Sequence, residues 1–158
     1  MNALSPMTAL SRRGALGVAA GAMALVTMRP ASAQFVRKDA SATLEAIKAF
    51  TGGKEAVAGK ITMDIPPLVE NGNSAPLKLD VPGLSDGVFV KRIGVFNEKN
   101  PLPETVTLHL GERTAPRVQT RVRLADSQTL TAIAELSDGT FHSTTADVIV
   151  TLAACVEG

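Results

Sequence analysis

Aromatic residues are almost absent from this chain of 158 residues, which contains five Phe and neither Trp nor Tyr. A hydrophobic core must therefore be built from Val, Ile, Leu and Ala. Cysteine is nearly absent as well, since Cys155 is the only one in the sequence. A single cysteine excludes an internal disulfide and leaves three roles open. It is a free thiol, a bridge to a second chain, or a site that carries another group.

Several kinds of chemical site are also missing from the sequence. No glycine-rich phosphate loop and no Ser–His–Asp signature occurs. His109 and His142 are the only histidines, and their spacing is not that of metal ligands, so structural or surface roles are favoured for both. The carboxylates are scattered, and no pair is marked out as a general acid and base. The sequence therefore predicts neither an enzyme nor a metal or cofactor site.

The first 33 residues have the layout of an export signal. Arg12 and Arg13 precede an apolar run over residues 15–26, and residues 31–33 form an A-x-A cleavage box. The run is about a dozen residues long, shorter than the ~20 that a membrane-spanning helix needs. The twin arginine favours the Tat route over the Sec route. We expect cleavage before Gln34 and a periplasmic product, with retention as a membrane anchor as the alternative.

The predicted mature chain is one domain of ordinary size, which can bury a hydrophobic core without the support of disulfides or metal ions. Removal of the signal takes away Arg12, Arg13 and Arg29 and no acid. The formal charge then changes from +1 to −2, because 13 basic and 15 acidic residues remain. No basic footprint is left to indicate a nucleic-acid partner.

A short amphipathic helix is predicted over residues 39–50. Leu44, Ile47 and Phe50 recur at three-residue spacing, and Gly52 and Gly53 follow as a stop signal. This helix and a connector make up residues 34–60.

Residues 61–152 change to short runs of β-branched and other apolar residues that alternate with polar ones. The predicted strands are residues 61–65, 77–81, 88–96, 105–110, 117–124, 129–136, 141–145 and 147–152, with a strong turn at residues 70–74. Gly94 within a strand indicates a bulge or a close approach. No stretch alternates a strand with a long helix. We therefore predict an all-β fold, an immunoglobulin-like antiparallel β-sandwich with a short N-terminal helix.

One predicted strand carries a basic stripe. Arg117, Arg121 and Arg123 all project outward from residues 117–124. The stripe is suited to an anion or an acidic partner, but runs of charge are more often a solvated face, which is the favoured interpretation.

Cys155 lies three residues before the carboxyl end, directly after the last predicted strand. Free cysteines are commonly buried and inert, whereas chain ends are mobile unless they are tied down. An extended segment gains at most about 3.3–3.6 Å per residue, which would place the thiol on the order of 10 Å clear of the sheet. These arguments leave a buried thiol and a functional thiol equally open.

Six separated motifs resemble the SoxY family of sulfur-compound carriers, over nearly the whole mature chain. They are residues 61–66 (ITMDIP), 70–73 (ENGN), 96–103 (FNEKNPLP), 121–125 (RVRLA), 134–139 (AELSDG) and the cysteine at the carboxyl end. The resemblance implies an immunoglobulin-like carrier of periplasmic thiosulfate oxidation. Such a carrier catalyses nothing itself, and Cys155 would be its point of covalent attachment.

The resemblance also implies partners. A second immunoglobulin-like subunit, SoxZ, would form a heterodimer with this chain. A haem enzyme, SoxXA, would join thiosulfate oxidatively to the thiol, a di-metal hydrolase, SoxB, would release sulfate, and further enzymes would remove the remaining sulfur. The alternative is a structural or assembly module on the same sandwich, with Cys155 inert or in an intersubunit disulfide.

The C-terminal arm, residues 153–158, departs from the Gly-Gly-Cys-Gly-Gly arm of that family. Ala153 and Ala154 precede the cysteine, and Val156, Glu157 and Gly158 follow it, which makes the end one residue longer. Alanine and valine adopt fewer backbone conformations than glycine. Glu157 and the terminal carboxylate also place negative charge near the sulfur, which disfavours the thiolate. We expect a stiffer and more acidic arm, suited to a different sulfur species or different enzymes.

Overall fold

The computed structural model describes residues 40–154, which form one helix and nine strands. The helix is α1 (Ala40–Thr51). The strands are β1 (Val57–Ala58), β2 (Thr62–Asp64), β3 (Leu68–Asn71), β4 (Ala75–Asp80), β5 (Val90–Asn97), β6 (Glu104–His109), β7 (Arg117–Val122), β8 (Gln128–Leu136) and β9 (Phe141–Leu152). A 3-10 turn, η1 (Gly72–Ser74), joins β3 to β4.

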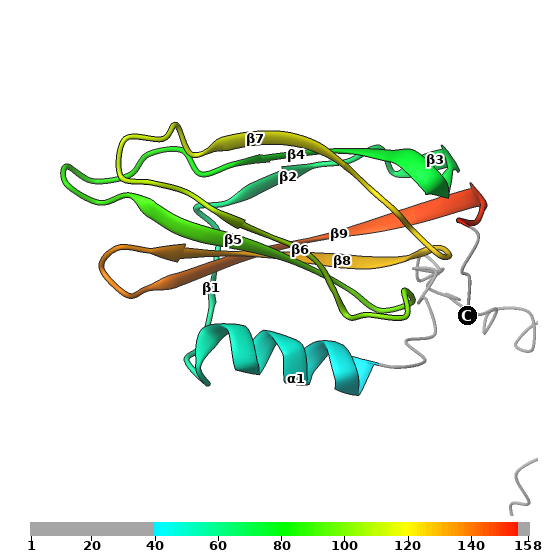
Figure 1. Ribbon diagram of the computed structural model, residues 1–158, viewed down its shortest axis with the longest axis horizontal. Coiled ribbons are helices and arrows are strands. Elements are labelled where there is room, and N and C mark those ends of the chain that lie inside the picture. Colours follow the sequence, from blue (N-terminus) through cyan, green and yellow to red (C-terminus); the bar gives the residue numbers. More distant parts are fainter. Residues whose placement is uncertain (1–39, 155–158) are drawn as a thin grey trace, which may run out of the picture. The chain divides into compact units, whose positions relative to one another are not determined.

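The strands form two sheets that face each other (Figure 1). The larger sheet has the order β1-β9-β8-β5-β6, and β3 also pairs with β9. The smaller sheet has the order β2-β4-β7. Long neighbouring strands pair antiparallel, as β5 does with β8 and β8 with β9. The predicted all-β sandwich with a short N-terminal helix is confirmed.

The main core lies between the two sheets and contains no aromatic side chain. Alternate residues of β4, such as Leu77 and Leu79, meet alternate residues of β8, such as Leu130 and Leu136, and all four are fully buried. Every buried residue of this cluster is Val, Ile, Leu or Ala. The scarcity of aromatic residues therefore predicted the composition of the core correctly.

Helix α1 covers the outer face of the larger sheet, where the aromatic residues gather (Figure 1). The ring of Phe50 packs edge-on against Phe96, with the centroids 5.4 Å apart, and against Phe141 at 6.4 Å. Gly94 lies beneath this cluster, and a Cβ atom there would come within 2.9 Å of both the Phe50 and the Phe96 rings. The predicted close approach at Gly94 is thus confirmed, because the helix layer leaves no room for a side chain.

The buried face of α1 differs in part from the predicted stripe. Phe50 is buried and Ile47 is half-buried, but Leu44 is 63% exposed. Thr43 is buried in its place, and its hydroxyl donates to the carbonyl of Asn97, 2.7 Å away. A polar contact with the end of β5 therefore sets the rotation of the helix at its first turn.

Two features of the larger sheet were not predicted. β1 and β3 pair in parallel with β9, with Val57 opposite His142 and Leu68 opposite Ile149. The two strands predicted at residues 141–145 and 147–152 are one continuous strand, β9, because Ala146 keeps its place in the inward-facing alternation. β9 thus runs the length of the sheet and ends beside β3.

Candidate functional site

The chain leaves β9 at one end of the sandwich and is still tied down two residues later. Ala153 is exposed, but Ala154 is only 5% exposed, and its amide donates to the carbonyl of Leu124 over 3.1 Å. The hydroxyl of Thr151 donates to the carbonyl of Glu70 over 3.1 Å. Ala154 thus links the chain at the end of β9, in the larger sheet, to the chain that follows β7 of the smaller sheet.

Gly72 makes this crossing possible. Its carbonyl accepts from the amide of Leu124 over 2.8 Å. A Cβ atom on Gly72 would lie 2.4 Å from the Leu124 carbonyl oxygen and 3.0 Å from the Ala154 amide nitrogen. The first distance is far inside van der Waals contact, and both obstacles are backbone atoms that cannot turn aside. The sequence predicted Gly72 as part of a turn. In the fold it lies where the backbones of Gly72, Leu124 and Ala154 come together, a three-way approach.

Asn100 clamps the same backbone from the loop after β5. Its amide group donates to the carbonyl of Arg123 over 2.8 Å, and its carbonyl oxygen accepts from the amide of Ala125 over 2.9 Å. The buried Gln128 donates to that same oxygen over 3.1 Å. Asn100 thus fixes the residues on either side of Leu124, the residue that holds Ala154. The sequence marked residues 96–103 as a family motif, but this role of Asn100 and Gln128 was not predicted.

Asn97 holds the loop itself in shape. The buried side chain donates to the carbonyls of Leu102 and Pro103, at 2.9 and 3.1 Å, and to the Thr105 hydroxyl at 2.8 Å. Its own side-chain oxygen accepts from the amide of Asn100 over 2.8 Å. A buried amide that meets all its partners rigidifies its surroundings. The loop is therefore a preformed part of the arm-bearing end.

Cys155 lies outside the residues that the structure describes, and so do Val156, Glu157 and Gly158. Of the predicted arm, the structure places only Ala153 and Ala154. Because Ala154 is anchored, the residues beyond the last anchored position number four, not the six that follow Leu152. Four extended residues span about 13–14 Å.

The predicted arginine stripe is divided by its contacts. Arg117 forms an ion pair with Asp80 through two nitrogens, at 2.9 and 3.1 Å. Arg121 donates to the carbonyl of Ser74 over 3.1 Å. The side chain of Arg123 has no hydrogen bond or ion pair with residues 40–154. Only the end of the stripe nearest the arm therefore has a cation without a partner in this part of the chain.

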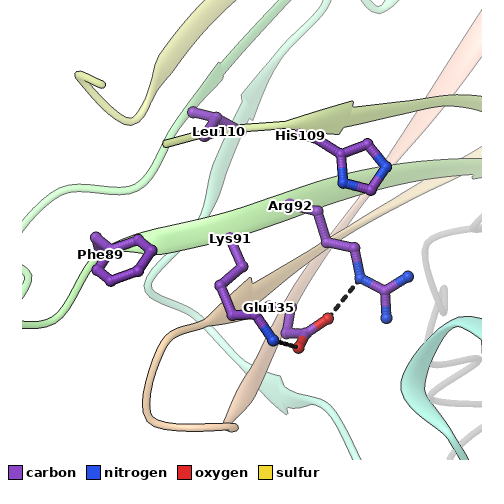
Figure 2. Close-up of a pocket in the computed structure, with 6 residues that line it drawn as sticks. All are labelled: Phe89, Lys91, Arg92, His109, Leu110 and Glu135. Atoms are coloured by element: carbon purple, nitrogen blue, oxygen red, sulfur yellow. Dashed lines mark hydrogen bonds and ion pairs between the residues drawn. The ribbon is translucent and has the colours of Figure 1, made fainter. Parts of the chain in front are cut away.

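An open pocket of about 510 Å³ lies at the other end of the sandwich (Figure 2). The side chains of Lys91 and Arg92 both point to Glu135, whose carboxylate accepts from each. Arg92 also donates to the carbonyl of Phe50 over 2.8 Å and stacks on the Phe50 ring at 4.1 Å. These charged groups pair with one another, and Arg92 also holds α1 against the sheet. The pocket is therefore a structural contact between helix and sheet, which we call the joint.

The ionisation of Glu135 follows from this arrangement. Burial alone would raise the pKa of Glu135, but hydrogen bonds from Lys91 and Arg92, together with their charges, outweigh it and hold the pKa below the usual value of 4.5. Glu135 is therefore ionised at neutral pH and is no candidate for a general acid.

The two histidines lie apart. His109 is exposed at the rim of this pocket, and His142 is buried on β9, where its Nδ1 has no hydrogen-bond partner among residues 40–154. Among residues 40–154, no group of three or more His, Cys, Asp or Glu side chains could hold a metal ion. In the same part of the chain no helix is long and apolar enough to cross a membrane.

Comparison with solved structures identifies proteins of the same fold. The sulfur carrier protein SoxY from Chlorobium limicola f thiosulfatophilum matches with a TM-score of 0.60 and 23% sequence identity, over 70% of this chain and 93% of that chain. A superoxide reductase (neelaredoxin) variant from Ignicoccus hospitalis matches with a TM-score of 0.51 and 14% identity, over 65% of this chain and 86% of that chain. At these identities the likeness concerns the fold alone.

Comparison with protein families is more specific. A search of curated proteins found no match. The family model described as "Sulfur oxidation protein SoxY" matches residues 47–155, which is more than half of the chain and ends at the cysteine. The chain therefore belongs to the SoxY family of sulfur oxidation proteins.

Proposed function

We propose that this protein is a periplasmic sulfur carrier, which holds intermediates of thiosulfate oxidation covalently on Cys155. In this proposal residues 1–33 direct export through the Tat route and are removed before Gln34. The protein is not an enzyme but the substrate that Sox enzymes act on in turn, and a SoxZ-like subunit forms a heterodimer with it.

The observation that supports this proposal most is where the shared motifs meet. Gly72 comes from the ENGN motif, Asn100 from the FNEKNPLP motif, and residues 123–125 from the RVRLA motif. These three segments bond to one another, and two of them contact Ala154, the residue before Cys155. Positions far apart in the sequence thus build one platform around Ala154, the residue that precedes Cys155 in the sequence.

The chemistry that this role requires of Cys155 is oxidation of its thiol together with thiosulfate. A sulfur–sulfur bond forms between Sγ and the terminal sulfur of thiosulfate, with loss of the thiol proton and two electrons. A SoxXA-like haem enzyme would accept the two electrons in successive one-electron steps. A SoxB-like hydrolase then adds water across the bond to the sulfonate group, so that sulfate leaves and a persulfide remains on Cys155. The platform contributes no group to these steps, and it presents the thiol at a fixed end of the sandwich.

Intact mass spectrometry tests this proposal. The mature protein, with its SoxZ-like subunit, is incubated with thiosulfate and a SoxXA-like cytochrome, and a control omits the cytochrome. We expect one adduct per chain, which a reducing agent removes and which Cys155→Ser does not form. An unmodified mass in the complete mixture would overturn the carrier role. It would favour the structural or assembly module, whereas a Cys155-linked dimer would indicate an intersubunit disulfide.

A further inference from the structure

A groove of about 650 Å³ lies between β6 and β7, which are the free edge strands of the two opposed sheets. The inward-facing Val106 and Leu108 of β6 and Val118 of β7 are only half-buried, whereas their counterparts in β4 and β8 are buried. The sandwich is therefore not closed by side chains along this edge. Ala154 is one of the residues that line the groove.

The groove offers apolar surface at its opening. Leu102 lines it and is 73% exposed, the most exposed large apolar side chain among residues 40–154. The half-buried Val106 continues this surface on β6, and the buried Val122 lies next to it on β7. Exposed apolar surface of this kind is favourable to cover.

The charge in the groove is positive at the side nearest the arm. Arg121 and Arg123 line it, and Glu104 is the one acidic residue that does. The Glu104 carboxylate already accepts from the Thr107 hydroxyl over 2.7 Å. Arg123 has no side-chain partner among residues 40–154, in contrast to Arg117, which is paired with Asp80 on the same sheet. An anionic group that enters the groove thus meets an uncommitted guanidinium.

We propose that this groove binds the C-terminal tail of the same chain, residues 155–158, when Cys155 carries nothing. The tail begins at a residue that lines the groove, and four extended residues span about 13–14 Å. Val156 would cover the apolar surface formed by Leu102, Val106 and Val122. Glu157 and the terminal carboxylate would pair with Arg123 and Arg121. The residues that distinguish this arm from a glycine arm are thus the ones that the groove complements.

Disulfide trapping in the isolated mature protein tests this docking. Thr120 faces the groove from β7, so Thr120→Cys places a second thiol there, and Val106→Cys does so from β6. Ser85→Cys places a thiol on the exposed loop between β4 and β5 as a control. In oxidised glutathione we expect Thr120→Cys and Val106→Cys to form an intramolecular disulfide with Cys155 at least about tenfold faster than Ser85→Cys, because docking raises the effective concentration. Mass loss and resistance to alkylation report the bond.

A charge variant isolates the contribution of Arg123. Arg123→Glu in the Thr120→Cys background should slow trapping by about two- to fivefold, the range of an exposed ion pair. Arg113→Glu makes the same change of net charge at an exposed position outside the groove and should leave the rate unaltered. Trapping no faster than in Ser85→Cys, equal effects of the two arginine variants, or disulfide-linked dimers would each overturn the proposal. No sulfur compound or partner enzyme is used, so these outcomes leave the carrier role untouched.

Discussion

At the end of the sandwich where β5 begins, three charged side chains pair with one another, whereas at the end where β9 finishes the contacts are made by amides and backbone carbonyls. Glu135 is bracketed by Lys91 and Arg92, and it is the one acidic residue that lines the pocket there. At the other end Asn100 satisfies two backbone groups, and the side chain of Arg123 is left without a partner among residues 40–154.

The two ends therefore differ in how their contacts use charge. A group of charges that neutralise one another fastens α1 to the sheet but offers little to a ligand. A platform held by neutral amides keeps its shape without consuming the charge beside it. Arg123 therefore remains available to an anion, whether on the tail or on a partner.

The largest effect is expected when the platform is overfilled. Gly72→Ala adds a Cβ atom 2.4 Å from the Leu124 carbonyl oxygen, so the backbone must shift. We expect a loss of about 3 kcal/mol in the free energy of unfolding, at the upper end for overpacking. Gly111→Ala is the matched control at the other end, where the nearest atom to the new Cβ is 3.5 Å away, and it should change stability by less than about 0.5 kcal/mol. Urea unfolding of the two variants measures both, and equal midpoints would contradict the three-way approach.

Removal of the amide clamp comes next. Asn100→Ala leaves the Arg123 carbonyl and the Ala125 amide without their partner, which should cost about 2 kcal/mol. Hydrogen exchange should also accelerate at Ala154, because its acceptor, Leu124, lies between the two released groups. Asn73→Ala is the control, since no side-chain bond of Asn73 is part of the platform. Unchanged exchange at Ala154 would mean that the loop does not hold the root of the arm.

Removal of the Glu135 charge at the other end of the sandwich should lower the free energy of unfolding by less than Asn100→Ala does. This loss should also depend on pH. Glu135→Gln is expected to lower the free energy of unfolding by about 1–2 kcal/mol at pH 7, a reduced value because Lys91 is half exposed. The folded-state pKa of Glu135 is lowered, so its stabilisation is complete above the usual value of 4.5 and is lost as the pH falls through the folded pKa. The difference between wild type and variant should therefore shrink below about pH 4.5. Unfolding at a series of pH values measures it. The Asn100→Ala difference should stay constant over the same series, and a parallel decline would erase the contrast between the ends.

The smallest effect is expected for an ion pair at neither end. Lys78 and Asp64 lie 3.1 Å apart on the smaller sheet, with both side chains more than half exposed. Asp64→Asn should cost less than about 1 kcal/mol, and high salt should remove the difference. Thermal unfolding at low and high salt measures this. A cost as large as that of Glu135→Gln would show that burial is not what distinguishes the joint.

Much of the sandwich could be predicted from the sequence because alternation records which face of a strand is buried. Leu77 and Leu79 are an example, and both are fully buried as their spacing indicates. β1 and β3 escaped prediction because two and four residues are too few to show a period. Their parallel pairing with β9 is a tertiary contact that no local pattern encodes. The prediction that Leu44 lies on the buried face of the helix was wrong for a related reason, since the contact of Thr43 with Asn97 sets the rotation of the helix.

The candidate site divides in the same way. Cys155 could be named because uniqueness and position are visible in a linear sequence, and its role stays a prediction. The anchoring of Ala154 could not be predicted, because it depends on Leu124, which follows β7 of the opposite sheet. The groove was equally invisible, since it exists only because two edge strands from different sheets remain apart. The sequence predicted one basic stripe of Arg117, Arg121 and Arg123, whereas the structure gives the three side chains different contacts.

In the proposed carrier role, the anchored amide of Ala154 also limits which enzymes could act on Cys155. The cysteine follows it directly, so a reactive centre at the bottom of a channel deeper than roughly 10 Å is out of range unless the channel admits the sandwich end as well. An enzyme that acts on Cys155 in this role must therefore contact η1, the Asn100 loop and the end of β7 with the residues around its active-site entrance. In the proposed role, the shape of this fixed surface would determine which enzymes bind. Changes in the last four residues would alter the chemistry of the thiol without changing the choice of enzyme.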